Sequence, residues 1–236
     1  MNPFLKAFTP EKLSEAWEIV VRDFPPELWV TLYITLLSTL FAIIIGLPLG
    51  ILLVTGDEKG IRPLPKPLMK VINVIINFLR SVPFIILMVM VIPLTRAITG
   101  TSIGSVASIV PLVVAAFPFV ARLVESSLRE LDPNIIEMAQ SMGASTMQIV
   151  LRVMLPESVP SLVTNFTLAI TTILGYTAMS GAMGGGGLGK IAINYGYSRY
   201  KYAVLYLAVI VLVLVVQVFQ SVGSRLATRL VKRIKR

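Results

Sequence analysis

The clearest feature of the chain is a set of five apolar stretches, each long enough to cross a bilayer, which takes about 20 residues as a helix. They cover residues 28–54, 71–95, 97–121, 158–189 and 202–224. Within them the only charged residue is Arg80. Because a lipid-facing backbone must satisfy its own hydrogen bonds, this pattern predicts an all-α integral membrane protein with five transmembrane helices.

The stretches differ in regularity. The first contains Gly46 and Gly50 around a proline, a spacing that indicates either close helix packing or a kink. The third contains Pro111 and Pro118 and is expected to be an irregular helix. The fourth is longer than one straight span requires and ends in a glycine-rich run.

Residues 1–27 precede the first span and form a separate extension. Thr9-Pro10-Glu11 is typical of a helix start, and apolar residues then recur at helical spacing. The pattern predicts an amphipathic helix that ends before Pro25-Pro26. The five-span domain then covers residues 28–224, and a basic tail covers residues 225–236.

One long polar segment, residues 132–156, separates the third and fourth spans. Asp132 followed by Pro133 is a helix N-cap with proline at the first helical position, where it is tolerated. Gly143 is expected to end that helix, because glycine adopts the left-handed conformation at little cost.

A second helix is predicted to follow at once. Ser145 and Gln148 have the spacing of a capping box, in which each side chain bonds the other residue's backbone N–H. The helix is expected to run to Leu155, where Pro156 and Pro160 oppose simple continuation.

The composition excludes several classes of catalytic and binding site. Hydrophobic residues make up 56% of the chain and charged residues 14%, and there is no cysteine or histidine. Thiol nucleophiles, disulfides, thiolate metal sites and histidine bases are therefore excluded. The net charge of +9 comes from basic residues that flank apolar runs, which is typical of a topology signal and not of a nucleic-acid surface.

The basic residues also predict orientation. Thirteen of the 21 Lys and Arg residues lie in residues 55–70, 122–157 and 225–236, and seven lie on the opposite side. The richer side is expected to be cytoplasmic, so the N-terminus is outside and the C-terminus inside. This places residues 132–156 in the cytoplasm, independently of any motif.

At this segment the sequence resembles a known family. The residues that carry the resemblance keep the spacing E-A-A, three residues, G, nine residues, I-x-L-P; they are Glu137, Ala139, Gly143, Val153, Leu155 and Pro156. Met138 replaces the motif's first alanine, and Val153 replaces its isoleucine. The segment thus resembles the EAA loop of permease subunits of binding-protein-dependent ABC importers. The alternative is a short amphipathic hairpin on the membrane surface.

Further stretches, residues 80–87, 100–104, 118–122, 175–189 and 195–197, resemble the methionine-uptake branch of that family. The resemblance implies a type I importer architecture, a homodimer, two separate ATP-binding subunits and an extracytoplasmic substrate-binding lipoprotein. It also implies that Glu137 makes a polar contact with the ATPase, Ala139 permits close approach, Gly143 makes the turn, and Leu155-Pro156 set where the second helix leaves the interface.

The glycine-rich run nearly matches the spacing of a phosphate-binding loop. It comprises Gly184, Gly185, Gly186, Gly187 and Gly189. Lys190 follows, but Ile191 stands where the Ser or Thr that holds magnesium would be, and no strand precedes the run. We expect a hinge or close-packing point. The chain itself is expected to bind no cofactor, with ATP and magnesium held by the partner ATPase.

Candidates for a translocation path are Arg80 and polar or sulfur-bearing residues of the fourth span, namely Asn165, Thr171, Thr172, Tyr176, Met179 and Ser180. An ionisable residue inside a span suggests function. Alternatively, Arg80 reaches the inner interface or pairs with Glu125, and the other residues make helix–helix contacts.

Together these features predict a non-enzymatic permease subunit in a bacterial inner membrane. The resemblance implies that it imports methionine, in the L or D form, or a close analogue, by alternating access driven by a separate ATPase. The alternatives are the same machine with another amino acid or a small peptide as cargo, a passive channel, or a membrane scaffold. A channel would be expected to carry its own selectivity ring.

Overall fold

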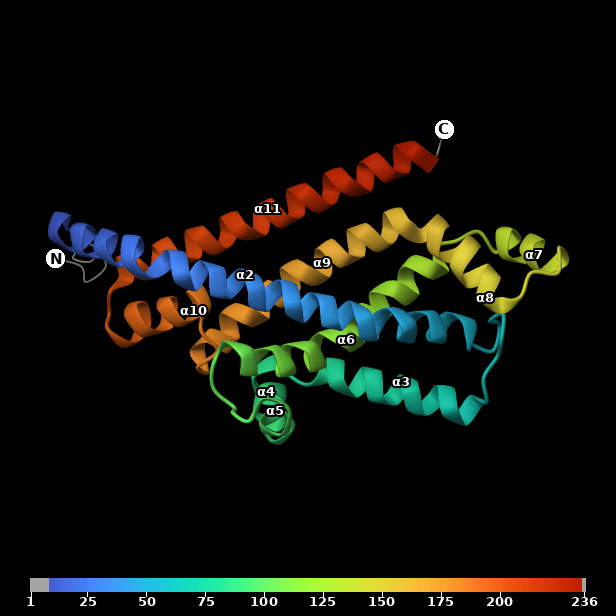
Figure 1. Ribbon diagram of the computed structural model, residues 1–236, viewed down its shortest axis with the longest axis horizontal. Coiled ribbons are helices and arrows are strands. Elements are labelled where there is room, and N and C mark those ends of the chain that lie inside the picture. The colour runs from blue at the N-terminus through green and yellow to red at the C-terminus, as the bar shows by residue number, and fades with distance from the viewer. Residues whose placement is uncertain (1–8, 235–236) are drawn as a thin grey trace. The chain divides into compact units, whose positions relative to one another are not determined.

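The computed structural model describes residues 9–234, and every regular element in that range is helical (Figure 1). Residues 1–8 of the extension and 235–236 of the tail lie outside the described part. The elements are α2 (Pro10–Thr55), α3 (Lys66–Ser81), α4 (Phe84–Met90), α5 (Ile92–Thr99), α6 (Ser105–Arg129), α7 (Pro133–Ser141), α8 (Thr146–Ile149), the π-helical turn η1 (Val150–Met154), α9 (Leu155–Ala182), α10 (Gly187–Ile191), the π-helical η2 (Ala192–Ser198) and α11 (Tyr202–Ile234).

Within the described residues, four helical stretches are long and apolar enough to cross a membrane. They are Pro10–Thr55, Ser105–Arg129, Thr146–Ala182 and Tyr202–Val231. Helices α3 and α4 meet the same criterion together, bent by 112° at the break between them, so the chain has five spans when this pair is counted as one. The prediction of an all-α membrane protein with five spans is confirmed, although several boundaries differ.

The predicted break at Pro25-Pro26 is wrong, because α2 continues through both prolines for 46 residues. A proline inside a helix leaves the carbonyl four residues earlier without its donor. Those carbonyls belong to Val21 and Arg22, which are both exposed, so water can bond them. The extension and the first span are therefore one helix.

The predicted second span, residues 71–95, is divided between α3, α4 and α5. Val82 adopts an extended conformation, with φ −78° and ψ 126°, because the ring of Pro83 disfavours the helical region for the residue before it. Helix α5 ends at Gly100, whose φ of 74° is left-handed.

Consequently the third long helix, α6, starts at Ser105 and not at residue 97. It remains one α-helix through Pro111 and Pro118, and an irregularity at these prolines stays a prediction.

The second helix of the polar segment does not end at Leu155. The π-helical turn η1 leads directly into α9, which passes through Pro156 and Pro160. In this turn the Leu155 N–H donates to the Val150 carbonyl, five residues earlier. The wider turn relieves the clash that Pro156 would make with the carbonyl of Arg152 in a regular helix.

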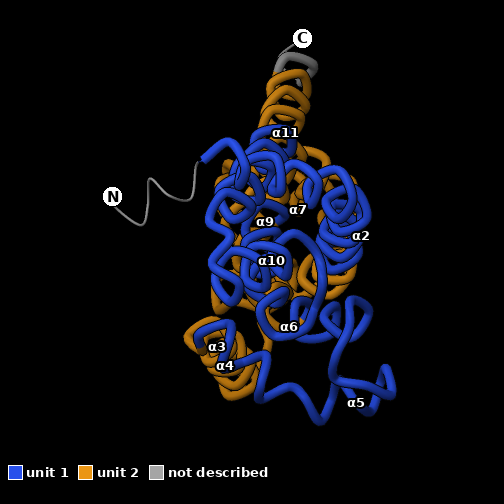
Figure 2. The backbone as a smooth tube through the Cα atoms, turned by 90° about the vertical axis from the view of Figure 1, so that its left-hand side faces the viewer, with its two compact units in different colours: residues 1–39, 83–113, 170–219 blue, residues 40–82, 114–169, 220–236 orange. Residues whose placement is uncertain are grey.

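The chain divides into two compact units (Figure 2). In the first, formed by residues 1–39, 83–113 and 170–219, the described core packs the start of α2 against α10, η2 and α11. The second comprises residues 40–82, 114–169 and 220–236.

Within the second unit, α2 packs closely on α6. A Cβ added at Gly46 would lie 2.8 Å from Val120, and one at Gly50 would lie 2.5 Å from Val124. Of the two interpretations of this glycine pair, the structure supports close packing.

Candidate functional site

The first helix of the polar segment, α7, begins as predicted. The side chain of Asp132 accepts a hydrogen bond from the Asn134 N–H at 2.9 Å, and Pro133 occupies the first helical position. At the other end, the Gly143 N–H donates to the Gln140 carbonyl at 2.9 Å. Gly143 has φ 75°, and a Cβ added there would meet no atom within 4 Å. The turn therefore depends on the backbone conformation of Gly143, with no steric constraint.

The second helix begins with the predicted capping box. The Ser145 N–H donates to Gln148 Oε1 at 2.8 Å, and the Gln148 N–H donates to Ser145 Oγ at 3.4 Å. Both caps follow from residues within three positions of each other, which explains why the sequence predicts them.

The two short helices have distinct faces. Buried inside the chain are Ala139, Ile149, Val150 and Met154. Among the exposed residues are two apolar pairs spaced four apart, one on each helical stretch; we call these four residues the methionine face, and they are Met138, Met142, Met147 and Leu151. Their exposed fractions lie between 56% and 74%. Exposed apolar side chains on a polar loop are typical of a protein docking site, and methionine side chains adapt well to a partner surface.

The residues of the EAA-like motif occupy different environments. Glu137 and Pro156 are exposed, and Val153 and Leu155 are half-buried. Ala139 is only 3% exposed, so the close approach that its small side chain permits lies within the chain. The two exposed pairs of the methionine face fall mostly outside the motif, and helical spacing of apolar residues would have been the signal for them.

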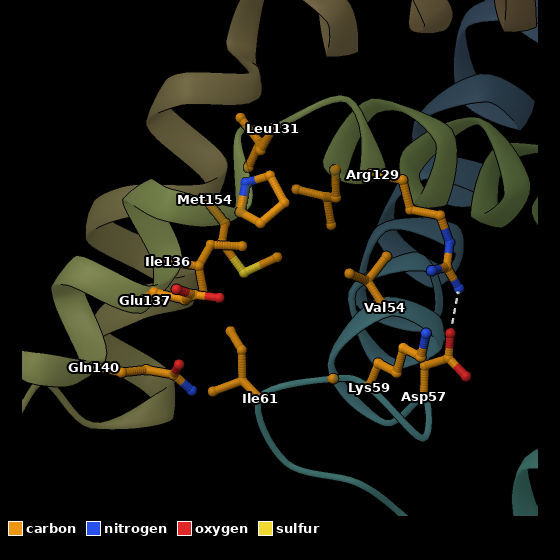
Figure 3. Close-up of a pocket in the computed structure, with 13 residues that line it drawn as sticks. Val54, Asp57, Lys59, Ile61, Arg129, Leu131, Ile136, Glu137, Gln140 and Met154 are labelled. Atoms are coloured by element: carbon orange, nitrogen blue, oxygen red, sulfur yellow. Dashed lines mark hydrogen bonds and ion pairs between the residues drawn. The ribbon is translucent and has the colours of Figure 1, made fainter.

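A cavity of about 520 Å³ adjoins α7 (Figure 3). Glu137 and Gln140 line it from α7, and Lys59 and Ile61 line it from the segment that follows α2. Glu137 thus lies beside the methionine face and points toward a second segment of the same unit.

A chain of ion pairs holds that second segment. Arg129 binds Asp57 at 2.8 Å and Glu125 at 2.9 Å, and Glu125 also binds Arg122 at 2.6 Å. Hydrogen bonds from Arg129 and from the Glu58 N–H lower the pKa of Asp57. Glu125 therefore pairs with two arginines of its own helix, and the proposed Arg80–Glu125 pair is wrong. No local pattern predicts the Asp57–Arg129 pair, because 72 residues separate the partners.

The candidate path residues are placed as follows. In the second unit, Arg80 is exposed in the last turn of α3, and Asn165 donates to Ser127 Oγ at 2.7 Å. In the first unit, Tyr176 stacks on Phe84 with ring centroids 4.7 Å apart. Ser180 is buried, and Met179 is 41% exposed. Asn165 and Tyr176 make contacts between helices, as the alternative interpretation expects, and a path through these residues stays a prediction.

The glycine run adopts conformations that suit glycine. Gly184, Gly186 and Gly187 have φ values of 91°, 83° and 78°, in the left-handed region. Gly189 packs directly against the backbone of Ala178. Close packing is therefore observed, and a hinge role stays a prediction.

With this geometry in place, comparison with known proteins defines the class. Residues 46–236 match the family described as "Binding-protein-dependent transport system inner membrane component", so the chain belongs to that family. It is a multi-pass permease of the inner membrane, a transport component and not an enzyme.

Individual relatives are more specific. The chain is 43% identical over 202 residues, 86% of its length and 89% of the relative's, to the "Probable D-methionine transport system permease protein MetI" of Vibrio cholerae. It is 38% identical, over 71% of its length and 76% of the relative's, to the "Methionine import system permease protein MetP" of Bacillus subtilis. It also resembles a chain of the solved structure "Inward facing conformations of the MetNI methionine ABC transporter", with TM-score 0.85 and 44% identity over 88% of this chain and 95% of that one.

Proposed function

We propose that the chain is the transmembrane permease of an ATP-driven ABC importer for methionine, in the L or D form, or a close analogue. The cargo rests on the similarity to methionine permeases over most of both chains. The coupling mechanism rests on one observation, the exposed methionine face on two capped helices.

In this mechanism each of two partner ATPases, which hold ATP and magnesium, grips one copy of residues 132–156. The methionine face supplies the apolar contact area, and the exposed Glu137, which precedes Met138, adds a polar contact. The stretch from Thr146 to Ala182 is continuously helical, so a displacement of the loop passes along one helix into the fourth span. Access to the cargo then alternates between the two sides without covalent chemistry in this chain.

The assembly would contain a second copy of this chain, the two ATPases and an extracytoplasmic substrate-binding lipoprotein. The distribution of basic residues supports an external N-terminus and a cytoplasmic C-terminus. That orientation places the methionine face on the same side as ATP.

The docking role is tested with matched substitutions. Replacing Met138 and Met142 together by Glu puts two charges on the apolar contact, and we expect the ATPase no longer to co-purify and methionine uptake into vesicles to stop. Replacing the same two residues by Leu preserves an apolar surface and should preserve both properties. Retention of the ATPase by the Glu variant would contradict the docking role.

The cargo is tested separately, by ATP-dependent uptake of labelled methionine with the cognate binding protein and by competition with other amino acids and small peptides. Stronger uptake of another amino acid would change the cargo and leave the importer class intact. Flux without ATP would indicate a channel, and a chain that co-purifies with no ATPase would indicate a scaffold.

A further inference from the structure

The start of α2 has no role in the mechanism above, yet it makes many contacts in the first unit. Five of its residues are spaced four apart, a row that forms a continuous ridge along a helix. We call them the clasp row; they are Glu15, Ile19, Asp23, Glu27 and Thr31. Each contacts the part of the chain from Gly187 onward, and all five precede Gly46, where the family match begins.

Glu27 makes the most specific contacts of the row. One carboxylate oxygen accepts a hydrogen bond from the Gly187 N–H at 2.6 Å, and the other pairs with the Lys190 ammonium at 2.9 Å. The Glu27 side chain is only 19% exposed. Both oxygens therefore bind the first turn of α10, one through the backbone and one through a charge.

Thr31 extends this arrangement by one turn. Its hydroxyl accepts from the Leu188 N–H at 2.8 Å and donates to the Glu27 carbonyl at 3.0 Å. Gly187 fits because it has φ 78° and because an added Cβ would lie 2.6 Å from Thr31 Oγ1. Two consecutive backbone N–H groups of the glycine run, those of Gly187 and Leu188, are thus bound by side chains of α2.

The other members of the row bind farther along the chain. Asp23 accepts a hydrogen bond from the Tyr195 hydroxyl at 2.7 Å, and Glu15 pairs with Lys201 at 2.6 Å. Ile19 is buried in the apolar cluster that contains Leu188. The contacts therefore cover residues 187–201 from end to end.

We propose that the clasp row fixes residues 187–201 in one position, and that Glu27 is the positioning residue for the segment that leaves the glycine run at the end of the fourth span. The functional part of this proposal rests on the permease function proposed above. Without Glu27, the Gly187 N–H loses its acceptor and Lys190 loses its carboxylate, so the three left-handed glycines between α9 and the rest of α10 are held by fewer contacts. We expect transport to weaken while the coupling helices and ATPase binding remain intact.

The position of the segment can be measured directly, because the chain has no native cysteine. Ala192 is 8% exposed and lies in the same apolar cluster as Ile19 and Leu188, so Ala192→Cys supplies one buried thiol. In the full-length, detergent-purified chain, its rate of reaction with a maleimide reports opening of the segment.

Glu27→Ala should raise the labelling rate about tenfold, the scale of losing one charge-assisted hydrogen bond. Glu27→Gln keeps an acceptor for the Gly187 N–H and loses the ion pair, so it should have a smaller effect. Glu18→Ala, an exposed glutamate of the same helix, is the matched control and should leave the rate unchanged.

An unchanged rate in Glu27→Ala would overturn the clasp. If that variant does not fold, Thr31→Val replaces it: the isosteric side chain removes the acceptor for the Leu188 N–H, and an unchanged rate there overturns the proposal equally. Methionine uptake should fall severalfold in Glu27→Ala while the ATPase still co-purifies, and normal uptake would refute the transport role. Labelling needs no transport, so failed uptake by the unsubstituted chain would count against the proposed function alone.

Discussion

The turn between α7 and α8 offers a direct test of the coupling mechanism, because its geometry depends on one glycine. Gly143 has φ 75°, and no atom lies within 4 Å of an added Cβ. A substitution there costs conformational energy and creates no clash. The left-handed region costs an ordinary L-residue about 1–2 kcal/mol, which is a change of roughly 5–30-fold in the population of the turn. Asparagine tolerates this region better, and β-branched residues tolerate it worse.

We therefore expect a graded series in which ATPase binding and methionine uptake fall in the order Gly143→Asn, Gly143→Ala, Gly143→Val. The measurements are the affinity of the purified chain for the ATPase and uptake into vesicles. Gly175→Ala is the control, since Gly175 lies in α9 with free space and without a left-handed φ. Equal behaviour of Asn and Val variants would refute the conformational argument, and normal uptake by Gly143→Val would refute the coupling role.

Three further predictions concern the packing and charges of the second unit. Gly50→Val places methyl groups against Val124 of α6, so it should lower the melting temperature in detergent by the equivalent of at least about 1–3 kcal/mol. The control Gly175→Val should not lower it, and equal effects of the two substitutions would contradict the close packing. Glu125→Gln removes the charge shared by two arginines, so we expect lower thermal stability that added salt does not restore, because the carboxylate is only 13% exposed. Arg129 lowers the pKa of Asp57, so the Asp57–Arg129 pair stabilises the folded chain. This stabilisation is complete above the ordinary aspartate pKa and is lost as pH falls through the lowered pKa. Asp57→Asn should therefore flatten the loss of thermal stability below about pH 4, and an unchanged acid profile would contradict the pairing.

Features set by neighbouring residues could be predicted from the sequence. Asp132 with Pro133, and Ser145 with Gln148, act within three positions, so their residue types specify the caps. The conformation of Gly143 follows from the same local logic. The apolar runs predict the number of spans for a similar reason, since each run is one continuous stretch.

Boundaries and long-range pairs could not be predicted in the same way. Proline is a weak indicator on its own: Pro25 lies inside α2, Pro83 interrupts the second span, and Pro156 follows a π-helical turn. Whether a proline interrupts a helix depends on whether water can bond the freed carbonyl or a wider turn can accommodate the ring, and both are properties of the fold. Glu27 and Gly187 are 160 positions apart, so no sequence pattern connects them.

The uninterrupted course of α2 has a consequence for its environment. At 1.5 Å per residue, its 46 residues extend for about 69 Å along the helix axis, more than twice the roughly 30 Å of hydrocarbon in a bilayer. A large part of this helix must therefore lie outside the hydrocarbon region, among headgroups or in water. In the orientation proposed above, the acidic start of α2 and the segment that it binds, residues 187–201, lie on the extracytoplasmic side, and the ion pairs between them are exposed to the ionic strength of the medium.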